Sequence, residues 1–388
     1  MSLISNTNNR IINAHQMLSQ KNQLVEQIKM NLQNLFYLNI EKSILETYNY
    51  NELNSKFLKE RLEEIKPDII INDTFDFYIK NLVEKKEIEC ISYLTNNMYS
   101  FEYLERNRRQ LYSHFFRIKD YKQIYDDNFY NNLKVNLRRV MFRVARKLNY
   151  PTIEPFPQNN LKEKVNLIYT LPKLHPEVGT FEKENSKYFF LQPSVELFKQ
   201  EENSLISNKL FDFITDKKEQ QLAYISTGSF AGREKEFYFF WVNMLIQQGF
   251  KVILSSNLDE EIFLNHFKKN EVYIGKNLPQ KYILSHSDLF VTSGGWNSVL
   301  ESIFYEVPMI LSPFTGEQTL NALILEEAGL GRTLVKKRTK SETAESILYD
   351  VLANSSEIKE RMSLLREDYW EEEDLQEFCQ QLLNNLEA

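Results

Sequence analysis

The second half of the chain alternates short β-rich runs with longer stretches of helical spacing. The runs are Leu222–Thr227, Lys251–Ser256, Glu271–Lys276, Leu289–Thr292 and Met309–Ser312. Each is nearly continuous in apolar residues, which is typical of a strand buried on both faces. Strands of this kind separated by helices form a parallel sheet with helices on both sides. We therefore predict a doubly wound α/β domain over residues 206–375.

The first half carries fewer strand signals. Candidate strands are Lys66–Asp73, Glu89–Thr95, Val165–Thr170 and Tyr188–Gln192, whereas residues 1–65 favour helix and offer no opening strand. We predict a second α/β domain over residues 1–205 that is shortened or rearranged. The polar segment Ser194–Glu219 is expected to hold the connection, and residues 376–388 a helix that packs back on the N-terminal domain.

Composition excludes several classes of protein. The 388 residues suit two domains, and a net charge of −7 argues against a general binder of polyanions. Cys90 and Cys379 have no CxxC or Cys/His neighbours, so neither a zinc site nor a disulfide framework is expected. No apolar run is long enough to span a bilayer, and the polar start lacks a signal-peptide core. We predict a cytoplasmic protein that could also sit on a membrane surface.

The most informative stretch is a glycine turn between a strand and a helix. Gly294 and Gly295 follow the run that ends at Thr292, and Asn297 and Ser298 open the next helix. Glycines at such a turn let backbone amides approach a ligand closely. The helix start then offers unpaired N–H groups and a positive dipole end, which together favour a phosphate.

Carboxylates and amides follow at spacings that suit a sugar. Glu301 lies one turn beyond Ser298, where it could accept hydrogen bonds from ribose hydroxyls. Glu317 and Gln318 come after the strand Met309–Ser312, at the carboxyl edge of the sheet where such folds bind ligands. Taken singly, the glycine pair could be a tight corner and Glu301 a solvated helix residue. Their conjunction favours a sugar and a diphosphate held together.

The same residues resemble the donor-binding signature of the family 1 UDP-glycosyltransferases, which includes plant secondary-product and bacterial macrolide enzymes. The match comprises Leu278-Pro279-Gln280, Gly294-Gly295-Trp296-Asn297-Ser298, Glu301, Val307-Pro308, Pro313, Glu317-Gln318 and Asn321-Ala322, with Ser226-Thr227-Gly228-Ser229 upstream. The resemblance implies the GT-B fold, in which two Rossmann-like domains face each other and the C-terminal one binds the donor.

The resemblance also implies a role for each matched residue. Leu278, through its backbone, and Gln280 would hold base and ribose. Ser229, Asn297 and Ser298 would hold phosphate and Glu301 the ribose. Trp296, Glu317 and Gln318 would hold the sugar.

Three positions depart from the family pattern. Ser293 replaces the usual His before Gly294 and Gly295; it can donate to phosphate but carries no imidazolium charge. Asn277 stands where an aromatic residue commonly stacks on the base, which leaves the choice of base open. Glu306 replaces the usual Gly before Val-Pro.

The general base is not evident. An inverting transfer needs a group that takes the proton of the acceptor hydroxyl; in the family this is a His after the first strand, oriented by a later Asp. Asp73 matches that Asp, but the position expected for the His falls before Met1, and His15 is the only histidine upstream of Asp73. The sequence could be truncated, another group such as a desolvated Asp73 could serve, or catalysis could be lost.

Residues 106–147 form a basic stretch, with twelve Lys and Arg against three acids. Leu137, Val140, Met141, Val144 and Leu148 follow helical spacing, and the basic residues lie elsewhere around the helix. The stretch could be a core-facing helix with a solvated basic face, or a surface that meets anionic lipid or an acidic partner. Nucleic acid is not expected, because no recognised binding motif accompanies the charge.

The sequence thus predicts an inverting, metal-independent hexosyltransferase. A UDP- or dTDP-sugar would be the co-substrate, no other cofactor is expected, and the acceptor would be a hydroxyl of a small molecule or lipid. The alternative is a catalytically impaired protein of the same fold that acts as a binding or partner subunit. A Rossmann oxidoreductase is disfavoured because no Gly-x-Gly-x-x-Gly follows a strand.

Overall fold

The computed structural model describes residues 45, 57–74, 88–99, 101–107, 127–148, 163, 165–177, 187–199, 206–216, 220–228, 235–334, 344–369 and 372–387. Its internal contacts divide the chain into two compact units. One comprises residues 1–68, 76–88 and 126–160, and the other residues 69–75, 89–125 and 161–388. Both sheets of the described chain fall in this second unit.

The larger sheet has six parallel strands in the order β10-β9-β8-β5-β6-β7. Its strands are β5 (Leu222–Ser226), β6 (Lys251–Ser255), β7 (Val272–Gly275), β8 (Leu289–Thr292), β9 (Met309–Leu311) and β10 (Gly331–Thr333). β5, β8 and β9 are buried at every residue, as expected of strands covered on both faces. The strand order reverses between β5 and β8. The carboxyl ends of these two strands therefore form the switch point where doubly wound folds bind ligands.

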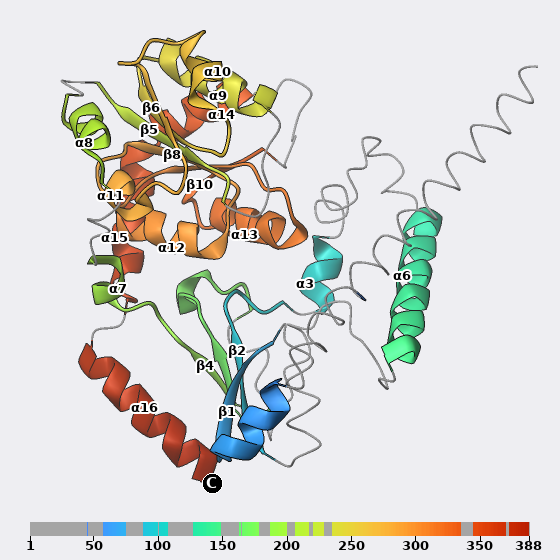
Figure 1. Cartoon of the computed structure of the whole chain (residues 1–388). Helices are drawn as coiled ribbons and strands as arrows, with labels where there is room; N and C mark the ends of the chain where they lie inside the picture. Colours follow the sequence, from blue (N-terminus) through green and yellow to red (C-terminus); the bar gives the residue numbers. More distant parts are fainter. Residues whose placement is uncertain are drawn as a thin grey trace, which may run out of the picture. The chain divides into compact units, whose positions relative to one another are not determined.

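Helices follow the strands and lie on both sides of this sheet (Figure 1). They are α9 (Lys235–Gln247), α10 (Glu260–Leu264), α11 (Gln280–Leu284), α12 (Trp296–Phe304), α13 (Gly316–Glu327), α14 (Ala344–Ala353) and α15 (Ser355–Arg366). The prediction of a doubly wound α/β fold is confirmed for this half of the chain. β10 was not predicted, because Gly-Arg-Thr carries no run of apolar residues.

The smaller sheet has four parallel strands in sequential order. They are β1 (Ile69–Asp73), β2 (Glu89–Leu94), β3 (Val165–Ile168) and β4 (Lys187–Phe190). The short helices α3 (Phe101–Arg106) and η2 (Pro172–Leu174) follow β2 and β3. Within the described residues this sheet has no reversal of strand order.

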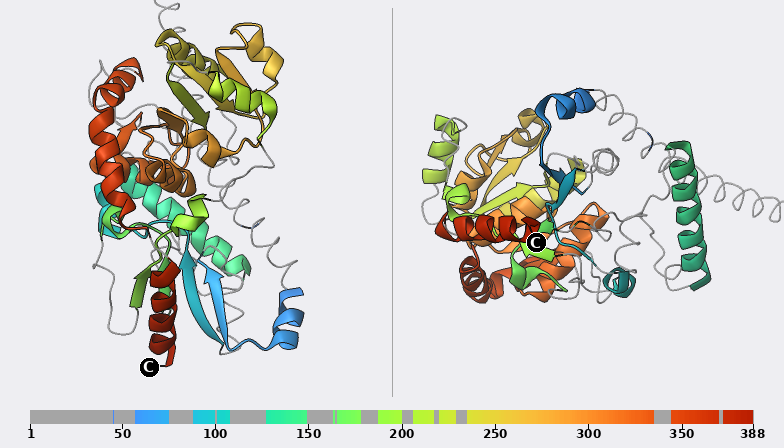
Figure 2. Two further views of the ribbon diagram at one scale, coloured as in Figure 1. Left: turned by 90° about the vertical axis from the view of Figure 1, so that its left-hand side faces the viewer. Right: turned by 90° about the horizontal axis from the view of Figure 1, so that it is seen from below.

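α16 (Glu372–Glu387) runs alongside the smaller sheet (Figure 2). Phe378 is buried against Ile91, Val165 and Leu167, and its ring meets that of Phe189 edge to face at 5.9 Å. The end of the chain therefore supplies part of the core of the smaller sheet.

The segment predicted as a polar connection contains two helices, α7 (Val195–Lys199) and α8 (Asn208–Thr215). Ser207 caps α8 by accepting from the Leu210 amide at 3.2 Å, and Leu210, Phe213 and Ile214 form its buried face. The prediction missed α8 because its two turns are short and lie within a segment rich in polar residues.

In the first unit the structure describes a helix over residues 57–65 and the 22-residue helix α6 (Asp127–Leu148). Among the α6 side chains that the structure describes, those of Val140, Val144 and Ala145 are buried. Among the described residues, none of the helices combines the length and the hydropathy needed to cross a bilayer.

Candidate functional site

The glycine turn lies after β8, at the switch point of the larger sheet. Gly294 has φ +81°, a conformation that favours glycine, whereas a Cβ on Gly295 would meet nothing within 4 Å. Gly295 is the N-cap of α12, and no side chain caps the helix there. The first intrahelical bond runs from Val299 N to Gly295 O. The N–H groups of residues 296–298 therefore have no acceptor within the helix.

Three hydrogen bonds fix the shape of this turn. Ser293 Oγ donates to Thr227 O at 2.7 Å, and Asn321 Nδ2 donates to Gly294 O at 3.0 Å. Gly294 N donates to Thr292 Oγ1 at 3.3 Å. The hydroxyl of Ser293, a predicted phosphate donor, thus ties the end of β8 to the end of β5 and is buried there.

Three residues that were predicted to bind the nucleotide sugar come together beside the start of α12. Gln280 Nε2 lies 3.0 Å from Ser298 Oγ and 2.5 Å from Glu301 Oε2. The side-chain oxygen Oε1 of Gln280 accepts a hydrogen bond from Tyr224 OH of β5 at 3.4 Å. Asn297 is exposed at the same helix end. Because amide, hydroxyl and carboxylate meet at one point, this cluster could pair with adjacent hydroxyl groups of one ligand.

Leu278 lies just before this cluster, at the end of β7. Its side chain covers Gly275, where a Cβ would approach Leu278 Cδ2 to 2.5 Å. The preceding residue, Asn277, takes up φ +51°. The backbone turn that presents Leu278 and Gln280 is therefore sharp and held by packing.

Two predicted sugar ligands make structural bonds. The indole Nε1 of Trp296 donates to Tyr169 O at 3.1 Å, and the residue is buried. Gln318 Oε1 accepts from the amides of Phe314 and Thr315 at 2.8 and 3.2 Å, in a capping box at the start of α13. Of the Gln318 side chain, the Nε2 group can meet a ligand without breaking this cap.

Glu317 stands in the first turn of α13. The residue is exposed, yet partial burial of its carboxyl raises the pKa of Glu317 above its usual range. Because the residue is exposed, the carboxyl oxygens of Glu317 can meet a ligand and accept hydrogen bonds from it.

Asp73 ends β1 and pairs in register with Tyr93 of β2. Its side chain is exposed. Burial, and secondarily the carboxylate of Asp73, raises the pKa of Tyr93. The desolvated environment that the sequence argument invoked for an Asp73 base is not found at this exposed position. Two predicted residues, His15 and Ser229, lie outside the described part of the chain.

Sequence reasoning gave no role to three tyrosines that frame the site. Tyr99 follows β2, Tyr169 follows β3 and Tyr224 lies within β5. Tyr99 OH donates to Asn321 Oδ1 at 3.0 Å. Burial, followed by the charges of Tyr93 and Glu301, raises the pKa of Tyr169 to about 12. The position of Tyr99 and Tyr169 after parallel strands was the available signal.

The sequence model described as "UDP-glucoronosyl and UDP-glucosyl transferase" matches residues 198–369. The NDP-glycosyltransferase YjiC of Bacillus subtilis is 25% identical over 349 residues, which cover 85% of this chain and 79% of that protein. The uncharacterized UDP-glucosyltransferase YdhE of the same species is 26% identical over 196 residues, 50% of this chain. The match covers 47% of YdhE, so the chain spans about half the length of that relative.

Solved structures share the fold. The glycosyltransferase of kitacinnamycin superposes with a TM-score of 0.59 and 20% identity, covering 81% of this chain and 75% of that one. Medicago truncatula UGT71G1, complexed with UDP-glucose, gives a TM-score of 0.57 and 16% identity, covering 81% and 74%. The prediction of a GT-B fold is confirmed.

Proposed function

We propose that this chain, a member of the family 1 UDP-glycosyltransferases through its residues 198–369, is a hexosyltransferase. It transfers a hexose from a UDP- or dTDP-sugar to a hydroxyl of a small-molecule or lipid acceptor. The transfer proceeds with inversion at the anomeric carbon. The observation that carries the proposal is the open start of α12 beside the cluster of Gln280, Ser298 and Glu301.

The diphosphate of the donor would bind at the start of α12. The N–H groups of residues 296–298 and the side chains of Asn297 and Ser298 offer donors there, and the helix dipole adds positive potential. This charge stabilises the nucleotide as a leaving group. The turn needs little rearrangement, because Ser293 and Asn321 already hold its backbone.

The ribose would bind at the neighbouring cluster. Glu301 accepts from hydroxyl groups, and Gln280 would exchange its bonds to Ser298 and Glu301 for bonds to the ligand. Glu317, as an exposed carboxylate, would be the main acceptor for sugar hydroxyls, joined by Nε2 of Gln318. Trp296 would contact the sugar through its ring, since its N–H is bonded to Tyr169 O.

Asp73 remains the proposed residue for deprotonating the acceptor or for orienting another base. It ends a strand of the smaller sheet, at the carboxyl edge that also carries Tyr99 and Tyr169. Because Asp73 is exposed, it suits an orienting or water-assisted role better than that of a strongly desolvated base. Replacing it with Asn keeps the shape and removes the charge, so turnover in Asp73→Asn tests both roles.

A second candidate is a protein that binds nucleotide sugars without turnover. The observation in its favour is that the polar atoms predicted to hold the sugar on Trp296 and Gln318 make structural bonds. This reading retains the phosphate and ribose sites and drops the transfer step.

One experiment separates these functions. Calorimetry with UDP- and dTDP-sugars measures donor binding, and product formation over a panel of acceptors measures transfer. Asn297→Ala and Glu301→Ala should each weaken binding about tenfold, the loss of a hydrogen bond to a charged partner. Asn265→Ala, at the exposed end of α10, is the matched control. Binding without product favours the second candidate, and no binding to any nucleotide sugar refutes both.

A further inference from the structure

α6 has an exposed apolar line opposite its buried side. A helix turns about 100° per residue, so residues seven apart lie on one face. Val135 and Phe142 are so related, and they are 44% and 68% exposed. Val140 and Val144, on the other side, are buried. The helix therefore satisfies its packing through one face and leaves a second apolar strip in contact with solvent.

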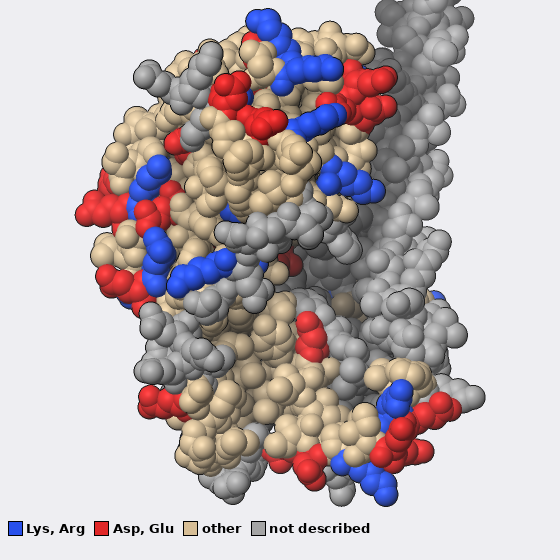
Figure 3. Space-filling model, turned by 60° about the vertical axis from the view of Figure 1, so that its left-hand side comes forward, with Lys and Arg blue, Asp and Glu red and all other residues tan. Residues whose placement is uncertain are grey.

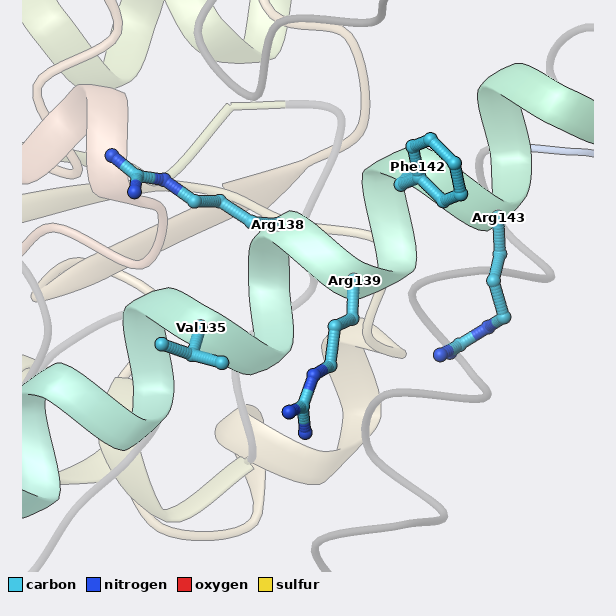
Figure 4. Close-up of a pocket in the computed structure, with 5 residues that line it drawn as sticks. All are labelled: Val135, Arg138, Arg139, Phe142 and Arg143. Carbon is cyan, nitrogen blue, oxygen red and sulfur yellow. The ribbon is translucent and has the colours of Figure 1, made fainter.

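Basic side chains flank this strip. Arg138, Arg139, Arg143 and Arg146 are all exposed. Among the described residues, the two apolar residues of the strip and three of these arginines line a shallow depression of about 400 Å³. Figure 4 shows Arg138 extending to the left, Arg139 and Arg143 extending downward, and the ring of Phe142 on the upper side of the helix. The charges are spread around the strip instead of converging on a single point.

The charge that α6 itself contributes to this face is of one sign. No Asp or Glu occurs from residue 128 to residue 148. On the face of the molecule drawn in Figure 3, by contrast, basic and acidic side chains alternate. Mixed charges are typical of a solvated surface, whereas a helix that combines an exposed apolar strip with arginines and carries almost no acidic residues of its own is typical of one that lies in a membrane interface.

We propose that the α6 face formed by Val135, Arg138, Arg139, Phe142 and Arg146 docks on the anionic headgroups of a lipid bilayer. Phe142 and Val135 enter the boundary between headgroups and acyl chains, and the arginines pair with lipid phosphates. A bilayer fits better than an acidic protein, because α6 presents an exposed apolar strip together with arginines spread around it, and a fluid surface adapts to spread charges. The docking does not depend on the proposed glycosyl transfer.

The test measures binding of the full chain to vesicles by flotation. The vesicles contain phosphatidylcholine alone or mixed with phosphatidylglycerol. The wild-type protein should bind the anionic vesicles only, and salt should weaken binding. Each basic residue near an anionic surface contributes about fivefold to the partition coefficient, so Arg138→Gln/Arg139→Gln should lower it by roughly 25-fold. Phe142→Ser should lower it by about tenfold.

Lys209→Gln/Lys269→Gln is the matched control, because it removes two exposed charges elsewhere and should leave vesicle binding unchanged. If the first pair disturbs folding, Arg139→Gln/Arg146→Gln provides an independent pair from the same face.

The proposal is refuted if the wild-type protein ignores anionic vesicles, if it binds both compositions equally, or if both arginine pairs bind like wild type. Binding to polyglutamate but not to vesicles would assign the face to an acidic protein instead. Calorimetry with nucleotide sugars on the same preparations, without vesicles, reports on the donor site, so failure of one proposal is distinguishable from failure of the other.

Discussion

The hydroxyl of Tyr99 lies 3.0 Å from Oδ1 of Asn321, and Nδ2 of Asn321 lies 3.0 Å from the carbonyl oxygen of Gly294. Tyr99 follows β2 of the smaller sheet, whereas Gly294 belongs to the turn after β8 of the larger one. Both Tyr99 and Asn321 are almost fully buried. A single side-chain amide therefore connects the two sheets through the proposed phosphate turn.

Replacing Tyr99 with Phe should destabilise the protein by about 1–3 kcal/mol, because Oδ1 of Asn321 would be buried without a donor. Urea unfolding measures this loss. The donor KM should also rise, since Asn321 would hold Gly294 less firmly. Tyr349→Phe, at an exposed position, should unfold like wild type. An unchanged unfolding free energy in Tyr99→Phe would show that this bond contributes nothing.

The two glycines of the turn should differ in their response to Ala. Gly294→Ala would place a Cβ at φ +81°, 3.4 Å from Leu311 Cδ2, and should cost about 1–2 kcal/mol and weaken nucleotide binding. Gly295→Ala should cost less, because its φ is −62° and the space is open, so that only the lower preference for Ala at an N-cap opposes it. Thermal unfolding and calorimetry on the pair check this, and equal effects at both positions would contradict it.

Trp296→Phe should separate structural from ligand-binding roles. It removes the indole N–H that donates to Tyr169 O and leaves that carbonyl without its partner. We expect a loss of about 1–3 kcal/mol in the free energy of unfolding, with a smaller change in nucleotide affinity. A variant with wild-type stability but altered preference among donor sugars would assign the indole N–H to the sugar instead.

The free energy of unfolding should decrease as the pH is lowered, because of His175. Burial lowers the pKa of this histidine from 6.5 to about 4, so the unfolded chain takes up a proton between these values while the folded chain does not. The contribution is fully present above pH 6.5 and is lost as the pH falls toward about 4, to the extent of about 3 kcal/mol. His175→Asn should flatten the pH dependence of urea unfolding in this window. His266→Asn, at an exposed position, should leave it unchanged.

Most of the larger sheet was predictable because its strands are buried on both faces and therefore read as apolar runs. Leu289–Thr292 and Met309–Leu311 are examples. β10 and α8 escaped because each is short and partly polar. The sequential order of the smaller sheet was not predictable either, since periodicity shows where strands lie and not which strands pair.

The glycine turn and the closeness of Ser298 and Glu301 could be predicted, because these residues are neighbours in sequence. Gln280 lies 18 and 21 residues from Ser298 and Glu301, and only the family resemblance pointed to it. The partners of the turn could not. Tyr99 and Asn321 are 222 residues apart, and Trp296 and Tyr169 are 127 residues apart. Contacts over such separations depend on how the two sheets meet, which no local pattern encodes.

Two hydrogen-bonded connections join the turn at residues 293–296 to segments that follow strands of the smaller sheet. One runs from Tyr99 through Asn321 to Gly294, and the other from Trp296 to the carbonyl of Tyr169. A motion that separated the two sheets at this turn would have to break both connections, since they lie within three residues of each other on one short loop. Breaking one connection alone would therefore not free the turn. The release of nucleotide and the entry of a new donor should accompany an all-or-none separation of the sheets at this turn.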